Sequence, residues 1–321
     1  MNELSKWLLP ALSAGTLFLA ACDVSSSSVN SGSGGSLSDP EGQAGVSGAL
    51  AAEAGAATTG VAGSSGAPST QAGGGAPGAG SAGTSGGASA GFVLSWQDDF
   101  DTLDSSAWQL QTFTFAGNEA QFSTENAVVH DGILSVSLTQ APTGSSKPYL
   151  GVEMRSAKTL TYGKVSTRMR FASGSGVVSS LVLFYTPYPN CDWNEIDIEH
   201  LGKSKTSIQL NAMVFKGTPV ANCTTSVAPT QDPLVASLDF DAESEFHLYD
   251  IEWTPRGVRY FADGALLRDW TANIALLKLP ATILLTIWAS SEPSWAGALT
   301  ATSAPTSADI DWIKVYDYVG G

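Results

Sequence analysis

The sequence predicts an all-β domain built from two packed antiparallel sheets. Residues 133–138 and 164–171 alternate between apolar and polar side chains, the two-residue period of strands with one buried face. Asp-Gly pairs at 131–132 and 263–264 separate such runs and are typical of tight β-hairpins. No long segment has a convincing 3.6-residue apolar period, so helical layers are not expected.

The composition narrows the classes of function. The chain has 321 residues and a net charge of −15, and its apolar and tryptophan content is sufficient for a sizeable core. The acidic balance and the absence of a basic run with interleaved aromatic residues argue against a nucleic-acid partner. No HExxH, CxxC or nucleophile-elbow pattern occurs, so neither a zinc enzyme nor a serine hydrolase is indicated.

The first 22 residues have the pattern of an export signal. Lys6 precedes an apolar run, residues 7–21, that is too short for a comfortable membrane span and ends in small residues. Its end, Leu-Ala-Ala-Cys, resembles a bacterial lipoprotein signal, in which Cys22 is lipidated and becomes the mature N-terminus. The alternatives are an ordinary cleaved signal and a buried helix with a chance cysteine. We expect an exported lipoprotein of the bacterial cell envelope, held at the inner or outer membrane by its lipid alone.

Residues 23–91 consist almost entirely of Gly, Ala, Ser, Thr and Pro, with four charges that are all acidic. This composition cannot bury a core and predicts a disordered, flexible tether. Residues 78–83, GAGSAG, fit the dinucleotide-binding glycine pattern, but no strand is expected before them and no helix after them. We therefore treat this match as accidental and place the folded domain at residues 92–321.

Residues 193–202, WNEIDIEHLG, concentrate acidic side chains. On a strand, Glu195, Asp197 and Glu199 would share one face, and the intervening isoleucines would lie on the other. A strand with its acids in water is the ordinary alternative. However, Asp and Glu are depleted in strands and three like charges on one face repel one another, so this pattern favours a functional site.

Paired carboxylates suit cleavage of glycosidic bonds, in which one protonates the leaving oxygen and the other attacks or stabilises the sugar cation. Residues four apart on a strand have Cα atoms about 13 Å apart. Two glutamates that lean inward could bring their carboxyl groups to the roughly 5–5.5 Å typical of retaining enzymes. Three neighbouring carboxyl groups cannot all ionise cheaply, so we expect a coupled titration that keeps one of them protonated near neutral pH.

The Glu-Ile-Asp-Ile-Glu run is the signature of glycoside hydrolase family 16, and residues 193–211 resemble its bacterial lichenase branch. The resemblance extends from Trp96 to Tyr316. It implies a concanavalin-like β-jelly roll with a sugar-binding cleft across its concave sheet, and a retaining mechanism on β-linked glucans or related polysaccharides. The supporting stretches lie at 95–108, 151–171, 175–185, 246–264, 286–297 and 308–316.

The resemblance also assigns roles to residues. Glu195 matches the nucleophile, Glu199 the general acid/base and Asp197 the middle carboxylate that tunes the nucleophile, and no cofactor is required for catalysis. The residues alone do not order the two glutamate roles. Aromatic rings suit the apolar faces of pyranoses. The implied contacts to sugar come from Glu153, Arg155, Trp193, Gln209, Asn211, Trp288 and Trp295, whereas Trp108, Trp253 and Trp312 are expected in the core.

The resemblance further implies a structural calcium ion on the convex side of the fold. The matching positions are the carboxylate of Asp311 and the backbone oxygens of Gly132 and Asp99, a hard-oxygen set that suits calcium. Asp99 stands where lichenases carry a proline.

Cys191 and Cys223 are the two cysteines that remain once Cys22 is lipidated. In an exported protein two remaining cysteines are expected to form a disulfide, and two free thiols are the alternative.

Two features depart from the lichenase pattern. Ala212 and Met213 occupy positions where lichenases carry an aromatic pair, so a tyrosine contact near the cleaved bond is expected to be missing. Residues 217–236 form an extra segment, which we expect to reshape one end of the cleft.

These observations predict a monomeric endo-glycoside hydrolase that retains configuration and cleaves β-1,3-1,4- or β-1,3-glucan. A transglycosylase on the same glucans would use the same covalent intermediate with a sugar as acceptor. A non-catalytic, glycan-binding surface lipoprotein is the alternative of a different class, and the intact acidic run disfavours it.

Overall fold

The structure is a computed structural model that describes residues 91–185, 192–216 and 229–320. The three cysteines and most of the extra segment at 217–236 lie outside the described residues, and so does the region expected to be signal peptide and tether. None of the described helices is long and apolar enough to cross a membrane.

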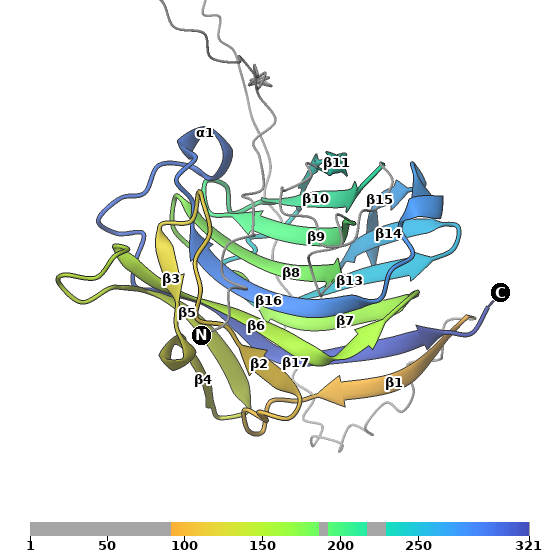
Figure 1. Cartoon of the computed structure of the whole chain (residues 1–321), viewed down its shortest axis with the longest axis horizontal. Helices are drawn as coiled ribbons and strands as arrows, with labels where there is room; N and C mark the ends of the chain where they lie inside the picture. The colour runs from red at the N-terminus through yellow and green to blue at the C-terminus, as the bar shows by residue number, and fades with distance from the viewer. Residues whose placement is uncertain (1–90, 186–191, 217–228, 321) are drawn as a thin grey trace, which may run out of the picture. The chain divides into compact units, whose positions relative to one another are not determined.

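The described strands form two antiparallel sheets, as the sequence predicts (Figure 1). The first sheet carries the acidic run, and each neighbouring pair in it is antiparallel. Its strands, in spatial order, are β2 (Trp108–Leu110), β6 (Tyr149–Leu160), β16 (Ala281–Ala289), β8 (Val177–Tyr185), β9 (Asn194–Leu201) and β10 (Ser207–Val214), with β11 (Thr230–Gln231) and β12 (Leu234–Ser237) along the far side of β10.

The second sheet is organised around the long strand β17, which pairs with β1, β5 and β7. Its strands are β1 (Phe92–Asp98), β17 (Thr306–Tyr318), β7 (Gly163–Arg170), β13 (His247–Thr254), β14 (Gly257–Ala262) and β15 (Ala265–Trp270), with β4 (Ala127–His130) and β5 (Ile133–Gln140) beside the first half of β17. The strand β3 (Ala120–Phe122) pairs with β6 in parallel, unlike every other described pair.

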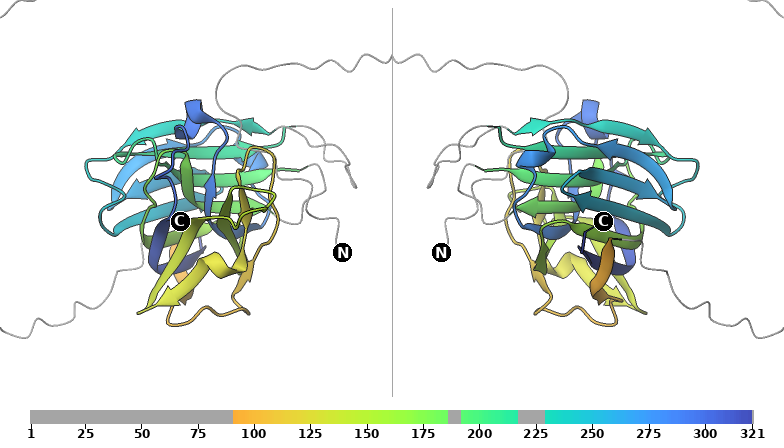
Figure 2. Two further views of the ribbon diagram at one scale, coloured as in Figure 1. Left: turned by 90° about the vertical axis from the view of Figure 1, so that its left-hand side faces the viewer. Right: turned by 90° about the vertical axis from the view of Figure 1, so that its right-hand side faces the viewer.

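Helical structure among the described residues is confined to single turns. These are the 3₁₀ turns η2 (Thr124–Asn126) and η3 (Ile274–Leu276) and the short helix α1 (Pro293–Ala296). Figure 2 shows the strands from two sides, with α1 at one margin of the first sheet. The two sheets therefore have to bury each other, because no helical layer covers either one.

The core lies between the two sheets and takes alternate residues of each strand. Ile196 and Ile198 of β9 belong to it, and Trp253 and Tyr260 of the second sheet are fully buried there. Trp108 and Trp253 confirm the expectation of core tryptophans. Trp312 does not, because its ring is only partly buried and the Lys314 ammonium lies 4.4 Å from the ring centroid.

Both predicted hairpins are present. Asp131 and Gly132 have φ angles of 52° and 74°, and Asp263 and Gly264 have φ angles of 46° and 79°. A two-residue hairpin turn whose twist matches that of the paired strands requires positive φ at both residues, and Asp-Gly tolerates this conformation. The turns join β4 to β5 and β14 to β15.

Candidate active site

The acidic run forms strand β9 in the interior of the first sheet. Glu195, Asp197 and Glu199 lie on the face opposite the two core isoleucines, as the alternation predicts. We call this surface of the first sheet the acidic face. The strand has β8 on one side and β10 on the other, so its backbone is held on both edges.

The register of the sheet places further polar side chains in line with Glu199. Residues directly opposite one another on paired strands share a face. Glu199 is opposite Ser180 of β8 and Gln209 of β10, and the line continues through Thr286 of β16 to Glu153 of β6. The hydroxyl groups of Ser180 and Thr286 are 2.5 Å apart and bond to each other. A polar row thus crosses the sheet at the level of Glu199.

Apolar clusters flank this row on the acidic face and are separate from the core between the sheets. By register, Trp288, Val178 and Leu201 lie on one side of the polar row, and Phe184 and Met213 lie on the other, opposite Glu195. The first cluster comprises Phe122, Val178, Leu201, Trp288, Trp295 and Ala296, with Phe113 and Phe115 packed against it. The second comprises Val182, Phe184, Trp193, Met213 and Leu284, with Phe215.

Each of the two glutamates accepts a hydrogen bond from a neutral side chain. Trp193 donates its indole Nε1–H to Oε2 of Glu195 at 2.6 Å. Gln209 donates from Nε2 to Oε2 of Glu199 at 3.0 Å, and its own Oε1 accepts from Nε1 of Trp295 at 3.0 Å. Neutral donors can stabilise a carboxylate without adding a second charge, and they fix the orientation of the carboxyl group.

Asp197 lies between the glutamates and is 2% exposed. Neither of its side-chain oxygens has a well-aligned hydrogen-bond partner in the described part of the chain, and Glu195 and Glu199 are the carboxyl groups whose charges act on it. Burial, together with the charges of Glu195 and Glu199, holds the pKa of Asp197 well above its usual range. Asp197 therefore favours its protonated form and can share that proton with Glu195.

Burial also raises the pKa values of the two glutamates. The pKa of Glu195 rises to about 8, with a contribution from the charge of Glu199, while the Trp193 indole and Asp197 act to lower it. The pKa of Glu199 rises to about 7, and the hydrogen bond from Gln209 opposes this rise. Three carboxyl groups this close cannot all be ionised near neutral pH, as the sequence predicts, so the group retains a proton.

The predicted sugar-contact residues all lie on the acidic face or beside it, but several already have partners within the protein. Arg155 donates from Nε to Oε1 of Glu153 at 2.7 Å, and burial raises the pKa of Glu153 while Arg155 opposes this. Asn211 is 1% exposed, and its Oδ1 accepts from the backbone N–H of Asp232 at 3.0 Å. Asn211 thus also fastens the segment between β11 and β12 to β10.

Sequence reasoning missed several contacts that line the acidic face or support it from the core side. Phe113 and Phe115 come from the segment between β2 and β3, and the Phe115 ring lies edge-on to Trp288 with centroids 5.1 Å apart. Asn194, which directly precedes Glu195, accepts at Oδ1 from the backbone N–H groups of Lys278 and Leu279 at 2.7 Å each. No local signal in the sequence identifies these contacts, because each depends on a distant strand or loop.

One of the expected calcium ligands has another partner. The carboxylate of Asp311 bonds to the guanidinium of Arg168, whereas Asp99 was expected to contribute its backbone oxygen and uses its carboxylate to accept from Gln97 at 3.0 Å. Within the described ranges no group of three or more His, Cys, Asp or Glu residues is arranged to hold a metal ion. In this arrangement the donor set does not fit calcium, because its single carboxylate, that of Asp311, is paired with Arg168.

Several proteins with related sequences are named beta-glucanases. The chain is 31% identical over 222 residues to the beta-glucanase of Paenibacillus polymyxa, a match that covers 66% of this chain and 83% of that enzyme. It is 33% identical over 182 residues to the beta-glucanase of Fibrobacter succinogenes, of which it covers 49%. The chain therefore spans about half of the second enzyme and most of the first.

Solved structures support the same relationship. A prokaryotic beta-1,3-1,4-glucanase (lichenase) from a mouse hindgut metagenome superposes with a TM-score of 0.60 at 30% identity, covering 70% of this chain and 99% of that one. The beta-glucanase of Bacillus licheniformis gives 0.59 at 26% identity, covering 71% and 98%. These neighbours identify the two-sheet fold as the jelly roll. The family model for glycosyl hydrolases family 16 matches residues 99–314, and the chain belongs to this family.

Proposed function

We propose that this protein cleaves β-1,3-1,4- or β-1,3-glucan at internal bonds and retains the anomeric configuration. The observation that carries the proposal is the arrangement of Glu195, Asp197 and Glu199 on one buried face, with a separate neutral donor for each glutamate. Family membership supports a glycosidase, and the names of the related proteins, beta-glucanase and lichenase, support a glucan substrate.

In the proposed mechanism Glu195 attacks the anomeric carbon and Glu199 protonates the departing glycosidic oxygen. Burial raises the pKa values of both glutamates, so the pair keeps one proton near neutral pH, and the form in which Glu199 holds that proton is the reactive one. The Trp193 indole and the proton shared by Asp197 stabilise the charge of Glu195 before attack. Glu199, now ionised, then removes a proton from the water that hydrolyses the glycosyl-enzyme.

Proton NMR of the first products from barley mixed-linkage glucan and from laminarin tests this proposal with the full chain. The β-anomer should appear first, followed by slow mutarotation. Early α-anomer would contradict retention, and no cleavage of either glucan would contradict the substrate class. With a short glucan oligosaccharide as substrate, products longer than that oligosaccharide would identify the transglycosylase. Binding of glucan without turnover would identify the glycan-binding lipoprotein.

We also propose that residues 1–22 are a lipoprotein signal, that Cys22 carries the lipid and that residues 23–91 tether residues 92–321, acting as a monomer, to a membrane of the cell envelope. The support is the Leu-Ala-Ala-Cys run and the Gly/Ala/Ser-rich composition. Incorporation of labelled palmitate in a bacterial host should require Cys22. A chain that is labelled equally well after Cys22→Ser would contradict this assignment.

We further propose a disulfide between Cys191 and Cys223, because two cysteines that remain in an exported protein are expected to pair. It would close a loop that includes Glu195 and contribute roughly 3 kcal/mol to the free energy of unfolding under the chain-entropy model. Mass spectrometry of the non-reduced protein after thiol alkylation should show neither cysteine modified.

A further inference from the structure

His200 directly follows Glu199 on β9, and its side chain points to the opposite side of the sheet. It is fully buried, and its ring stacks on Phe171 with centroids 5.3 Å apart and an interplanar angle of 19°. Strands place consecutive residues on opposite faces, so this imidazole lies behind the acidic face, directly beneath the backbone that carries Glu199.

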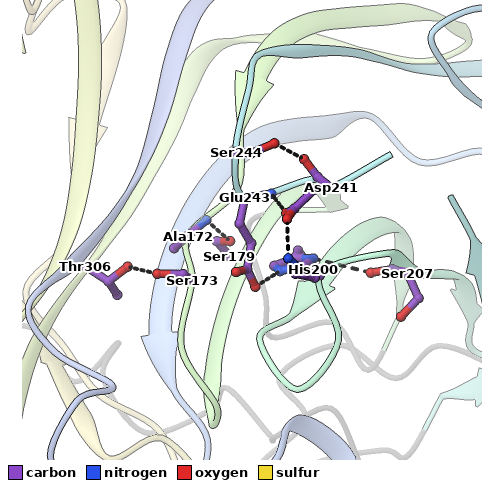
Figure 3. Close-up of polar contacts among 10 residues, drawn as sticks. Ala172, Ser173, Ser179, His200, Ser207, Asp241, Glu243, Ser244 and Thr306 are labelled. Atoms are coloured by element: carbon purple, nitrogen blue, oxygen red, sulfur yellow. Dashed lines mark hydrogen bonds and ion pairs between the residues drawn. The ribbon is translucent and has the colours of Figure 1, made fainter. Parts of the chain in front are cut away.

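Both ring nitrogens of His200 face acceptors, as Figure 3 shows. Nδ1 lies 3.3 Å from the backbone oxygen of Ser207, and Nε2 lies 3.1 Å from Oε1 of Glu243. Each ring nitrogen can donate or accept according to the tautomer, so the imidazole bridges a backbone carbonyl at the start of β10 and a carboxyl group of the segment that precedes β13.

Two further charged groups, Asp241 and Lys205, lie beside His200 and Glu243. Glu243 donates its backbone N–H to Oδ1 of Asp241 at 3.1 Å, and the Lys205 ammonium lies 2.7 Å from the Asp241 carboxylate. Phe171 covers the other side of the His200 ring without adding a charge. The imidazole, one ammonium group and two carboxyl groups thus meet where the β9–β10 turn contacts the segment that precedes β13.

The residues bonded to His200 lie on β10, which carries the hydrogen-bond donor of Glu199, and on the segment that precedes β13. Ser207 begins β10 two residues before Gln209, the residue that donates to Glu199. The segment that contains Glu243 is also bound to the β9–β10 turn, through the backbone N–H of Ala242 and the oxygen of Lys205 at 2.9 Å. His200 therefore links the strand of Glu199 to the strand of its hydrogen-bond donor, from behind the sheet.

We propose that His200 and Glu243 form a positioning pair that fixes Glu199 against Gln209 and so keeps the general acid aligned. This inference rests on the proposed function of Glu199. When the pair is lost, β9 and β10 are free to shift at the position where the 3.0 Å bond between Gln209 and Glu199 is made. Misplacement of a catalytic group by about 1 Å can lower the rate by up to a hundredfold.

His200→Phe tests the proposal, because it retains an aromatic ring on Phe171 and removes both hydrogen bonds. We expect kcat on the best glucan to fall about tenfold, with KM changed less than about twofold. The pH profile should shift upward, because a weaker bond from Gln209 favours the protonated form of Glu199. Glu243→Gln should have a smaller effect of the same kind, which keeps the test available if His200→Phe does not fold.

His247→Phe is the matched control. His247 also pairs with a carboxylate, Asp263, at 2.7 Å and also stacks on a phenylalanine, Phe240, with centroids 3.6 Å apart. It lies on β13 of the second sheet, and neither of these two contacts reaches β9 or β10. Its kcat and pH profile should match those of the unchanged protein.

A substrate whose leaving group needs no protonation separates an effect on the position of Glu199 from a general loss of activity. Pre-steady-state release of dinitrophenolate from a 2,4-dinitrophenyl β-glycoside of a glucan oligosaccharide requires the nucleophile but little protonation. In His200→Phe this burst should retain its normal rate while glucan cleavage falls. Equal losses on both substrates, or no loss on glucan, would overturn the inference. An unchanged protein that cleaves neither substrate would instead overturn the proposed function.

Discussion

Trp193 and Glu195 are joined by a 2.6 Å hydrogen bond from the indole Nε1–H to Oε2 of the carboxylate. The two residues are two positions apart, but Trp193 precedes β9 whereas Glu195 lies within it. The indole is 5% exposed and packs edge-on against Phe184, with centroids 5.4 Å apart. A donor held this firmly is directed at Glu195 before any substrate arrives, so it is preorganised for the charged form of this proposed nucleophile.

Trp193→Phe should therefore raise the pKa of Glu195 and weaken the enzyme most at acidic pH. The variant keeps an aromatic ring and loses the donor, and a hydrogen bond to a charged group is worth about 1.5–3 kcal/mol. We expect kcat/KM below neutral pH to fall about tenfold and the acidic limb to move to higher pH. Trp312→Phe, on the second sheet, is the control. An unchanged acidic limb in Trp193→Phe would show that the bond does not tune Glu195.

Glu195→Gln and Glu199→Gln should each lower turnover by at least about a thousandfold, because each removes half of a two-carboxylate mechanism. Asp197→Asn should cost less, since an amide at this position can still donate to Glu195. Reducing-sugar release on the best glucan measures the loss, and circular dichroism checks the fold. Near-normal activity in either glutamine variant would refute the assignment of Glu195 and Glu199.

The pH profile of kcat/KM should be bell-shaped, with limbs near neutral pH. Glu195 and Glu199 have pKa values raised to about 8 and about 7, and because they interact, the two apparent values belong to the pair. The active form holds one proton between them, so the rate rises as the first proton leaves near 7 and falls as the second leaves near 8. An acidic limb at the ordinary glutamate value near 4.5 would contradict this expectation.

The acidic face should also make stability depend on pH. A carboxyl group whose pKa is higher in the folded state stabilises the fold below its unfolded pKa, and this contribution is lost as the pH rises through its folded pKa. For Glu199 the window runs from about 4.5 to about 7. Glu199→Gln should exceed the unchanged protein by about 1–3 kcal/mol in free energy of unfolding at pH 8, with little difference at pH 4.

Urea unfolding at the two pH values measures this effect. Glu125→Gln, at an exposed position in the η2 turn, is the control for removal of one negative charge. Equal gains at pH 4 and pH 8 in Glu199→Gln would show that burial of the carboxylate is not the cause.

Calcium should have little effect on stability if Asp311 keeps its partner Arg168. The family resemblance implies a calcium ion at this position, so the two expectations can be separated by experiment. We expect the melting temperature to change by less than about 1 °C between excess calcium and chelator, below the several degrees that 1 kcal/mol of binding would produce in a small domain. Arg168→Ala should create calcium sensitivity if the arginine alone blocks the ion.

The sequence predicted the parts of the structure that depend on local period. Alternation assigned Glu195 and Glu199 to one face and Ile196 to the core, and the Asp-Gly pairs located two hairpins, because side-chain direction and turn geometry follow from neighbours in the chain. The fold and the acidic site could therefore be predicted before any coordinates.

Contacts between strands could not be predicted in this way. Gln209 and Trp295 are 86 positions apart, and His200 and Glu243 are 43 apart. A two-residue period gives the face on which a side chain lies but not the strand beside it, since the register comes from packing of the whole sheet. Trp312 illustrates the same limit, because its hydrophobicity predicted burial that its outward position does not provide.

The pairing of β10 with β11 has a practical consequence for redesign of the enzyme. Val214 is opposite Thr230 and Met213 is opposite Gln231, so the chain leaves the sheet and returns to it at adjacent, hydrogen-bonded positions. Asn211 secures the return by accepting from Asp232. Changing the number of residues between two fixed ends costs little, because loop-closure entropy grows only slowly with length. Val214 and Thr230 are thus natural joining points for cassettes from other members of the family, which would leave the pairing of β10 with β9 and β11 unchanged.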